Sequence, residues 1–376
     1  MYVRHLTVSD FRSWERADVA FEPGPNVLVG SNGQGKTNLA EAIGYLATLS
    51  SHRVAADAAL IRRGADIASA KAAVVSQGRE LRLEIDITAG KANRARINGA
   101  AVPRPRDLLG LLQVVIFSPE DLSVVRGDPG ERRRFLDDLL VQRTPRIAGV
   151  RADYERVLKQ RSALLKTVGL ARRAGRAGDL TTLDVWDGHL AVHGAQLMVA
   201  RLDLLDALYP EVAAAYAAVA PSSAALGMRY VPSLPNVVEM ERDTGVIEAA
   251  LLAELARVRS QEVERGVNLV GPHRDDVDIT IGELPVRGYA SHGESWSAAL
   301  AMRLGSFELL RADIAEPVLI LDDVFAELDA SRREQLARVA SKAEQVLITA
   351  AVASDVPDEL DGTRYDVHYG EIRRVI

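Results

Sequence analysis

The feature that most constrains the fold is a glycine-rich loop near the N-terminus. The stretch VLVGSNGQGKTN has the spacing Gly30-x-x-x-x-Gly35-Lys36-Thr37, with Gly33 inside the loop. An apolar run typical of a buried strand precedes the loop, and apolar residues at helical spacing follow it. Glycines permit positive φ angles, so successive backbone N–H groups can turn inward toward phosphate oxygens. The pattern therefore predicts a strand–loop–helix unit that holds a nucleotide.

The loop residues have separate expected roles. We expect Lys36 to reach the β- and γ-phosphates of ATP and the Thr37 hydroxyl to bind Mg²⁺. The helix that follows points its N-terminal partial positive charge at the same phosphates. An accidental Gly-rich turn is the alternative, and the strand–loop–helix setting makes it rare. The predicted nucleotide-binding residues of the loop are consecutive: Gly30, Ser31, Asn32, Gly33, Gln34, Gly35, Lys36, Thr37 and Asn38.

The bulk composition is that of an ordinary globular protein. With 376 residues, 48% of them hydrophobic and 26% charged, the chain has room for about two domains. The longest apolar stretch, LLGLLQVVIF, is about half of what a membrane helix needs. The chain has no cysteine, which excludes disulfides and thiolate metal sites, and no export signal is visible. We therefore expect a cytoplasmic protein without a membrane partner.

The net charge of −6 hides a local excess of basic residues. Residues 131–176 contain thirteen Lys or Arg and five Asp or Glu, and residues 91–106 contain five Lys or Arg and no acid. Nucleic acid responds to local charge, because salt screens charges beyond a Debye length of about 10 Å. From charge alone, a DNA-binding surface and solvated helix faces are equally good interpretations.

Strand-like segments at both ends of the chain surround a helical middle. This order predicts one discontinuous α/β domain that is interrupted by a mainly α-helical second lobe. We place the N-terminal part of the α/β domain at residues 1–125, the helical lobe at 126–266 and the C-terminal part at 267–376. The sequence contains no evident internal repeat and no heptad run long enough for an extended coiled coil.

A pair of acids near the C-terminus completes the predicted site. The apolar segment 318–321 reads as a buried strand and ends in Asp322-Asp323. A carboxylate at a strand end beside a phosphate loop holds Mg²⁺, which here would be Asp322. Asp323 is placed to polarise an attacking water. In isolation, acids that cap a buried strand would be a plausible alternative.

The stretch YASHGESW lies between the phosphate loop and the paired acids. Ser291 and Gly293 precede a helix that we expect to begin near Glu294, so backbone N–H groups and a hydroxyl would face outward. By itself this is an ordinary N-capped helix. Its position between the two nucleotide motifs favours a second, functional interpretation.

The order of these motifs resembles an ABC-type ATPase head, with Ser291 to Glu294 as the signature and Glu327-Leu328-Asp329 as the D-loop. More narrowly, the chain resembles the RecF family of bacterial DNA replication and repair proteins. A transport ATPase would be expected to show Leu-Ser-Gly-Gly-Gln and a gap much shorter than the 255 or so residues here. The stretches that carry the resemblance are LTVSDFRSW, GSNGQGKTNLAEAI, SHR, IFSPEDLSVVRGDPGERRRFLD, LVGPHRDDV, ASHGE and LILDDVFAELD.

The resemblance implies a nucleotide site shared between two subunits. Ser291 and Gly293 of one subunit would contact the γ-phosphate held by the loop of the other, and Asp329 would lie along the dimer seam. Thr349 follows the last core strand, where such heads place a γ-phosphate sensor. Arg12 is a further nucleotide-contact candidate. The lid-loop residue is either Gln113 or a residue beyond the strand that follows it, and the sequence leaves both open.

The resemblance also implies a function: a weak, DNA-stimulated ATPase in which ATP drives homodimerisation on DNA. Such a protein serves recombinational repair and replication-fork maintenance, including the SOS response to DNA damage. It would bind single-/double-strand junctions without reading base sequence, and help load the recombinase with RecO and RecR. The predicted DNA-contacting residues are basic residues of the helical lobe: Arg132, Arg133, Arg134, Arg151, Lys159, Arg161 and Lys166.

Two residues depart from the transporter pattern. Asp323 is one methylene shorter than the usual Glu, which predicts slow turnover and ATP used as a switch. His292 adds bulk where glycine is common, and we favour structural filling over catalysis. The turn Gly271 to Asp276 (GPHRDD) contains possible metal ligands, but we favour a structural turn with ion pairs.

Three other classes of protein remain as alternatives. An SMC-like structural ATPase would need long coiled-coil arms, and an ABC transport ATPase subunit would need a membrane partner. A P-loop kinase would make the signature and the acid pair coincidences.

Overall fold

A computed structural model describes residues 1–54, 56–173, 181–313 and 315–375. The chain divides into two compact units. Unit 1 contains Met1–Arg126, Pro210–Leu226 and Ile281–Ile376, and unit 2 contains Gly127–Tyr209 and Gly227–Thr280. The α/β domain is therefore discontinuous. The boundaries of this domain differ from those expected from the sequence, because residues 210–226 belong to unit 1 and residues 267–280 belong to unit 2.

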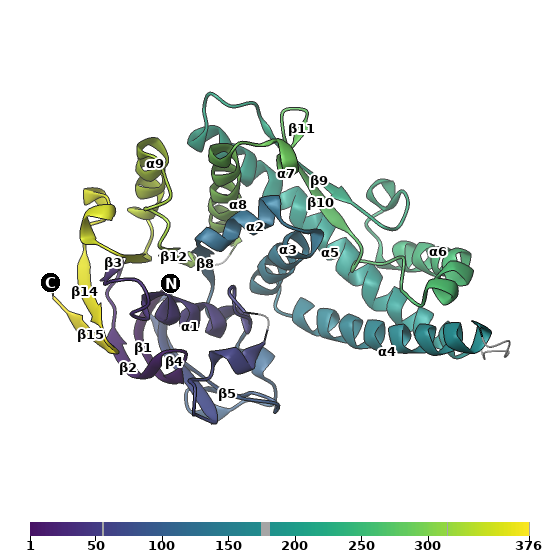
Figure 1. The fold of residues 1–376 in the computed structure, drawn as a ribbon, viewed down its shortest axis with the longest axis horizontal. Helices are drawn as coiled ribbons and strands as arrows, with labels where there is room; N and C mark the ends of the chain where they lie inside the picture. The colour runs from purple at the N-terminus through teal and green to yellow at the C-terminus, as the bar shows by residue number, and fades with distance from the viewer. Residues whose placement is uncertain (55, 174–180, 314, 376) are drawn as a thin grey trace. The chain divides into compact units, whose positions relative to one another are not determined.

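The first sheet of unit 1 (Figure 1) carries the nucleotide motifs at the carboxyl ends of its strands. Strands β8, β12, β13, β3 and β14 are parallel neighbours, and β15 pairs with β14 in the antiparallel sense. Because the carboxyl ends of parallel strands meet at one edge, the loop after β3 and the acids after β12 converge. In sheet order, the strands are β15 (Glu371–Arg374), β14 (Thr363–His368), β3 (Gly24–Val29), β13 (Gln345–Ala350), β12 (Val318–Asp322) and β8 (Val114–Phe117).

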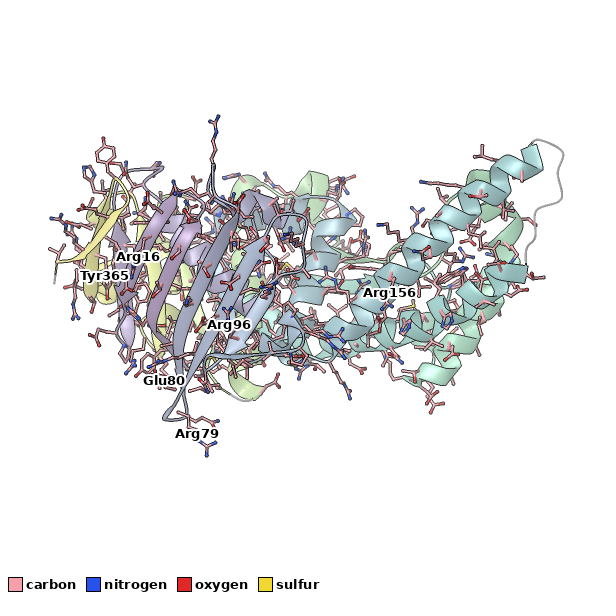
Figure 2. All side chains as sticks on the ribbon, turned by 90° about the horizontal axis from the view of Figure 1, so that it is seen from below. Arg16, Arg79, Glu80, Arg96, Arg156 and Tyr365 are labelled. Carbon is pink, nitrogen blue, oxygen red and sulfur yellow. The ribbon has the colours of Figure 1, made fainter. Side chains whose placement is uncertain are left out.

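The second sheet of unit 1 is antiparallel and half-buried. Buried and exposed residues alternate along its strands, as expected for a sheet with one face on the core. Figure 2 shows charged side chains on this sheet, Arg16, Glu80 and Arg96 among them. In sheet order, the strands are β2 (Trp14–Ala20), β1 (Tyr2–Phe11), β4 (Ile67–Ser76), β5 (Arg79–Thr88), β6 (Arg94–Ile97) and β7 (Ala100–Ala101).

Helix α1 (Lys36–Thr48) follows the phosphate loop and packs against strands of both sheets. Its apolar residues, Leu39, Ile43 and Leu46 among them, belong to one continuous core with the inner faces of both sheets. Both sheets therefore hold the loop in place through α1. The other helices of unit 1 are α2 (Leu122–Arg126), α7 (Val286–Tyr289), α8 (His292–Asp313) and α9 (Ala330–Ala340).

Unit 2 is mainly helical. Helix α6 begins after Asp243, whose side chain accepts two backbone N–H groups, and ends at Gly266 in the left-handed conformation. Helix α5 continues past the unit boundary at Pro210. The elements are α3 (Pro129–Arg143), α4 (Ile147–Arg173), α5 (Thr181–Val219), β9 (Leu226–Val231), α6 (Thr244–Arg265) and β10 (Asp276–Ile281).

Candidate functional site

The phosphate loop needs glycine at two positions for different reasons. Gly35 has φ of 100°, and a Cβ there would lie 2.7 Å from the Trp14 indole nitrogen. A Cβ on Gly30 would lie 2.2 Å from the backbone oxygen of Val367 in β14. Gly35 is needed for its backbone conformation and for the close approach of Trp14, and Gly30 for the close approach of the neighbouring strand β14.

The lysine of the loop lies over the loop itself. The Lys36 ammonium donates hydrogen bonds to the backbone oxygens of Gly30 at 2.7 Å and Ser31 at 3.3 Å. The Trp14 indole donates to the Gly35 oxygen at 2.9 Å, and Asn38 donates to the Ser13 hydroxyl at 2.8 Å. The loop is thus fixed by its own lysine and by the turn between β1 and β2. Trp14 is a contributor that the motif analysis missed, although it stands in the stretch LTVSDFRSW.

Two hydroxyl groups and one carboxylate form the candidate Mg²⁺ site. The hydroxyls of Thr37 and Thr349 both donate to the same Asp322 oxygen, at 2.9 and 2.6 Å. Asp322 and Thr349 are paired residues of the neighbouring strands β12 and β13. A hydroxyl and a carboxylate are the hard oxygen ligands that Mg²⁺ prefers, so these residues fit the ion.

The buried carboxylate of Asp322 has an unusual pKa. Burial raises its pKa to about 6, hydrogen bonds from Thr349 and Thr37 oppose the shift, and the negative charges of Asp323 and Glu120 add to it. A divalent cation would relieve the same penalty by supplying positive charge. A carboxylate whose pKa is shifted by burial is typical of a functional site.

The proposed water-polarising acid has a strained backbone. Asp323 has φ of 53°, a left-handed conformation that is uncommon for residues other than glycine. Its N–H donates to the Thr349 hydroxyl at 3.0 Å, which fixes the turn after β12. A cavity of about 150 Å³ lies at this edge, and its lining residues include Asn32, Pro119, Asp323, Phe325 and Thr349. The phosphate loop and the ends of three strands therefore border one space.

A larger cavity of about 590 Å³ lies on the outer face of the antiparallel sheet. Its charged residues pair with one another, Arg4 with Glu80 and Lys71 with Glu84. It contains none of the nucleotide motifs, so the smaller cavity is the better candidate for chemistry.

The two lid-loop candidates lie at opposite ends of β8. Gln113 precedes the strand and therefore lies at the edge away from the phosphate loop. Pro119 and Glu120 follow the strand, and Pro119 lines the cavity described above. The placement favours a residue beyond the strand. Arg53 lies 3.9 Å from Glu120 and donates to the Asn38 side chain at 3.1 Å.

Arg12 makes a bidentate pair with the fully buried Glu41 of α1. Its Nε and Nη2 atoms donate to the two Glu41 oxygens at 2.7 and 2.6 Å, and Nη1 donates to the Ala59 oxygen. Burial would raise the pKa of Glu41, but bonds from Arg12 and Ser51 and the charges of Arg12 and Arg53 outweigh it, so the pKa is lowered. A contact between Arg12 and nucleotide stays a prediction.

The signature turn is exposed and capped at the start of α8. The Ser291 N–H donates to the Glu294 carboxylate at 2.8 Å, and the Glu294 N–H donates to the Ser291 hydroxyl at 3.2 Å, a reciprocal capping arrangement. Ser291 and His292 are both exposed. The Trp296 indole donates to the His292 ring at 3.0 Å, which agrees with a structural part for His292.

Arg332 connects the signature turn to the D-loop, and no motif pointed to it. Its guanidinium pairs with Asp329, the residue that caps α9, and donates to the Ser297 hydroxyl at 2.7 Å. A Cβ on Gly293 would lie 3.1 Å from the same guanidinium. The sequence feature that could have pointed to Arg332 is its position three residues after Asp329, in the first turn of a helix.

Two of the seven predicted DNA-contacting residues are structural. Arg132 is 5% exposed and makes a bidentate pair with Asp276 at 2.7 and 2.9 Å. Arg161 is 0% exposed and pairs with Asp187 and Glu262. A buried guanidinium that is already paired cannot reach a DNA phosphate, so the expectation for these two residues is corrected.

The remaining five basic residues are at least partly accessible. Lys159 and Lys166 are exposed on α4, and the described part of the chain places no acid within salt-bridge distance of either. Arg133, Arg134 and Arg151 are half-buried near the start of α3 and α4. Arg151 pairs with Asp137, Asp138 and Glu155, and Arg134 with Asp138, so their charges are largely balanced.

The turn Gly271 to Asp276 is a network of hydrogen bonds. Asp275 accepts from the Tyr230 hydroxyl at 2.6 Å and from the Ser233 N–H at 2.7 Å. The His273 Nδ1 atom lies 2.7 Å from the Tyr154 hydroxyl. Across the described ranges no group of three acidic or histidine side chains is arranged to hold a metal ion. The geometry agrees with a structural turn.

Comparisons with known proteins place the chain in a family. The family model described as the RecF/RecN/SMC N terminal domain matches residues 2–361. The protein called DNA replication and repair protein RecF is 61% identical in Frankia alni and 57% identical in Streptomyces avermitilis, each over the full length of both chains.

Solved structures agree with this relationship and with the expected fold. RecF bound to ATP in the RecFOR pathway has a TM-score of 0.87 at 26% identity, covering 100% of this chain and 99% of that one. An Smc head domain from Pyrococcus furiosus shares the fold at a TM-score of 0.53. Over the part of the chain that is described, no helix has the length and apolarity needed to cross a bilayer. The α/β ATPase-head fold is confirmed, and the chain belongs to the RecF family.

Proposed function

We propose that this chain is an ATP-dependent DNA-binding protein of recombinational repair and replication-fork maintenance. The observation that carries the proposal is the meeting of Thr37, Asp322 and Thr349 around one carboxylate oxygen beside the phosphate loop. This arrangement suits Mg²⁺ and a nucleoside triphosphate. The full-length likeness to proteins called DNA replication and repair protein RecF supplies the biological role.

ATP acts as a dimerisation switch in this proposal. Ser291 is exposed and Gly293 is half-buried, so the hydroxyl of this turn is accessible to the nucleotide of a second copy. Lys36 and Thr37 hold the triphosphate and Mg²⁺ in one subunit, and the partner's exposed turn covers the γ-phosphate. Bound Mg²⁺ supplies charge neutralisation to the phosphates. Asp323 orients the attacking water, and its short side chain keeps hydrolysis slow unless DNA improves the geometry.

DNA binding in this proposal depends on backbone phosphates. Arg133, Arg134, Arg151, Lys159 and Lys166 give affinity with little base readout, as expected for recognition of single-/double-strand junctions. We expect the protein to act in the cytoplasm, where bacterial DNA lies. It would assist recombinase loading together with RecO and RecR, since solved relatives are described as mediators in the RecFOR pathway.

Sedimentation velocity with ATP, ADP and no nucleotide tests the switch. We expect a dimer only with ATP and Mg²⁺, and a monomer with the Ser291→Arg variant, whose bulk would block a partner's γ-phosphate. The same samples are then titrated with junction DNA and with duplex DNA. A wild-type protein that stays monomeric with ATP, or a Ser291→Arg variant that dimerises normally, would contradict the composite site.

A further inference from the structure

Unit 2 contains a cavity of about 250 Å³ that no nucleotide motif borders. It lies between the start of α3, helix α4, helix α5 and the turn Gly271 to Asp276. Four guanidinium groups line it, together with Tyr154 and His273: those of Arg133, Arg134, Arg151 and Arg201. Four positive charges around one small space repel one another unless acidic side chains balance them.

Three of the four arginines are balanced by nearby acids. Arg201 makes a bidentate pair with Asp137 at 2.8 and 2.9 Å. Arg151 and Arg134 share Asp138, and Arg151 also bonds to Glu155 at 3.1 Å. These contacts account for the acids of the cavity.

Arg133 is the exception. Its one hydrogen bond runs to the backbone oxygen of Asp275 at 2.7 Å, and across the described ranges no carboxylate lies within salt-bridge distance of it. Burial lowers the pKa of Arg133 and the positive charge of Arg201 lowers it further, while the negative charges of Asp276, Asp275 and Asp137 oppose the shift without cancelling it. A partly buried guanidinium that no described carboxylate contacts directly, and whose pKa stays lowered, is stabilised further by an anion that enters the cavity.

A second polar group at this cavity lacks a partner. The Nδ1 atom of His273 is engaged with the Tyr154 hydroxyl, while its Nε2 atom is buried and makes no direct hydrogen bond among the described residues, although the nearby Asn268 backbone oxygen raises the pKa of the ring. When the tyrosine donates to Nδ1, the neutral ring carries its proton on Nε2 and presents a donor. Within the described residues, the cavity thus combines a guanidinium that no carboxylate contacts directly with a ring nitrogen that makes no direct hydrogen bond.

We propose that this cavity binds one phosphate group, with Arg133 as the cation that contacts it and His273 as a further donor. The guanidinium fork suits phosphate oxygens better than it suits a halide or a single carbonyl. The proposal deepens the proposed DNA binding and rests on it for the source of the phosphate. That source is either a phosphodiester of the DNA backbone or the terminal phosphate of a strand at the junction.

The test compares Arg133→Ala, Arg133→Lys and the control Arg229→Ala. Arg229 is 77% exposed in the same unit and already pairs with Asp278. Fluorescence anisotropy measures binding of junction DNA carrying a 5′-phosphate or a 5′-hydroxyl. We expect Arg133→Ala to weaken binding about tenfold, Arg133→Lys to retain part of the affinity and Arg229→Ala to match wild type. Equal loss on both DNAs assigns a backbone phosphate, and loss confined to the phosphorylated DNA assigns a terminal one.

Inorganic phosphate provides a readout that does not depend on DNA. Protein saturated with Mg²⁺ and a non-hydrolysable ATP analogue is titrated with phosphate and followed by ³¹P line broadening, so that the nucleotide site, including its γ-phosphate position, is already filled. We expect line broadening with wild type and much less with Arg133→Ala. ATP-dependent dimerisation of Arg133→Ala, equal to that of wild type, is the control that this variant folds. Wild-type DNA affinity and phosphate broadening in a folded Arg133→Ala variant would overturn the proposal. Failure of all forms to bind DNA, with phosphate binding intact, would instead count against the proposed function.

Discussion

Lys36 shows how one side chain serves both the loop and its expected ligand. Its ammonium is held by two backbone oxygens of the loop and by no acid in the described residues, and the side chain is 3% exposed. A phosphate oxygen is a stronger partner for an ammonium group than a carbonyl oxygen is. The lysine is thus positioned in advance without being neutralised.

Lys36→Met tests the role of this charge, and Lys36→Arg, which keeps the charge, is the comparison. Methionine keeps the apolar stem and removes the charge, so we expect ATP affinity to fall by roughly 10- to 100-fold and ATP-dependent dimerisation to disappear. Titration with a fluorescent ATP analogue measures the first effect and sedimentation the second. Undiminished ATP binding by a folded Lys36→Met protein would refute the assignment of the loop.

Asp323→Asn separates nucleotide binding from hydrolysis. The amide is nearly the same size but is a poor base, so we expect hydrolysis to fall by about 100-fold while ATP affinity and dimerisation persist. Steady-state phosphate release with junction DNA measures the rate. Glu359→Gln, an exposed acid outside the site, is the control. Equal rates for Asp323→Asn and wild type would exclude Asp323 as the water-polarising acid.

His273 predicts a dependence of stability on pH. Burial lowers its pKa to about 4, and the nearby charge of Arg274 contributes. Between about pH 6.5 and pH 4 the unfolded chain binds a proton that the folded chain refuses, so stability falls as pH falls through this window. We expect the wild type to lose about 2 kcal/mol more than His273→Gln between pH 7.5 and pH 5. Urea unfolding at the two pH values measures this difference, and parallel losses would contradict it.

Single residues also show where sequence reasoning stops. The loop residues and Asp322 could be predicted because their chemistry is tied to a short motif. Arg132, Arg133 and Arg134 are consecutive and look alike in sequence. Arg132 is nevertheless buried in an ion pair, while Arg133 has no carboxylate within salt-bridge distance among the described residues. Arg132 is paired because Asp276, 144 residues away in the sequence, lies beside it in the fold. No local sequence pattern could predict this contact.

At the level of elements, parallel pairing decides which residues meet. Strand β12 has β13 on one side and β8 on the other, so their carboxyl ends bring Asp322, Thr349 and Pro119 to one edge. The strands themselves were predictable from apolar runs. The choice between Gln113 and a residue after β8 was not, because strand direction within a sheet is a tertiary property.

Arg332 joins the N-terminal ends of helices α8 and α9. We therefore expect it to couple the signature turn to the D-loop. Arg332→Ala removes the bonds to Asp329 and Ser297 and leaves the phosphate loop untouched. We expect ATP affinity of the monomer to be unchanged and ATP-dependent dimerisation to weaken about tenfold. Fluorescent-nucleotide titration and sedimentation measure the two quantities. Arg338→Ala, on the same helix and paired with Glu334, is the control, and an equal effect of both variants would remove Arg332 from this role.

At the scale of the whole molecule, the contrast between net charge and local charge becomes testable. The chain carries −6 overall, yet α4 presents the exposed Lys159 and Lys166, for which the described residues provide no acid within salt-bridge distance. If both contact phosphates, Lys159→Ala/Lys166→Ala lowers the slope of log affinity against log salt by about 2. Junction-DNA binding at a series of salt concentrations measures the slope. Lys342→Ala, an exposed lysine of unit 1, is the control, and an unchanged slope in the double variant would exclude these two contacts.

The bond between Thr37 and Asp322 joins residues 285 positions apart. A ribosome therefore emits the loop long before the acid that completes it, and the helical lobe emerges in between. A nascent or prematurely terminated chain can display the glycine-rich loop yet lacks Asp322, the carboxylate proposed to hold the magnesium ion. If ATP drives dimerisation as proposed, the ability to respond to it is acquired late in synthesis, and incomplete copies would not pair with finished ones.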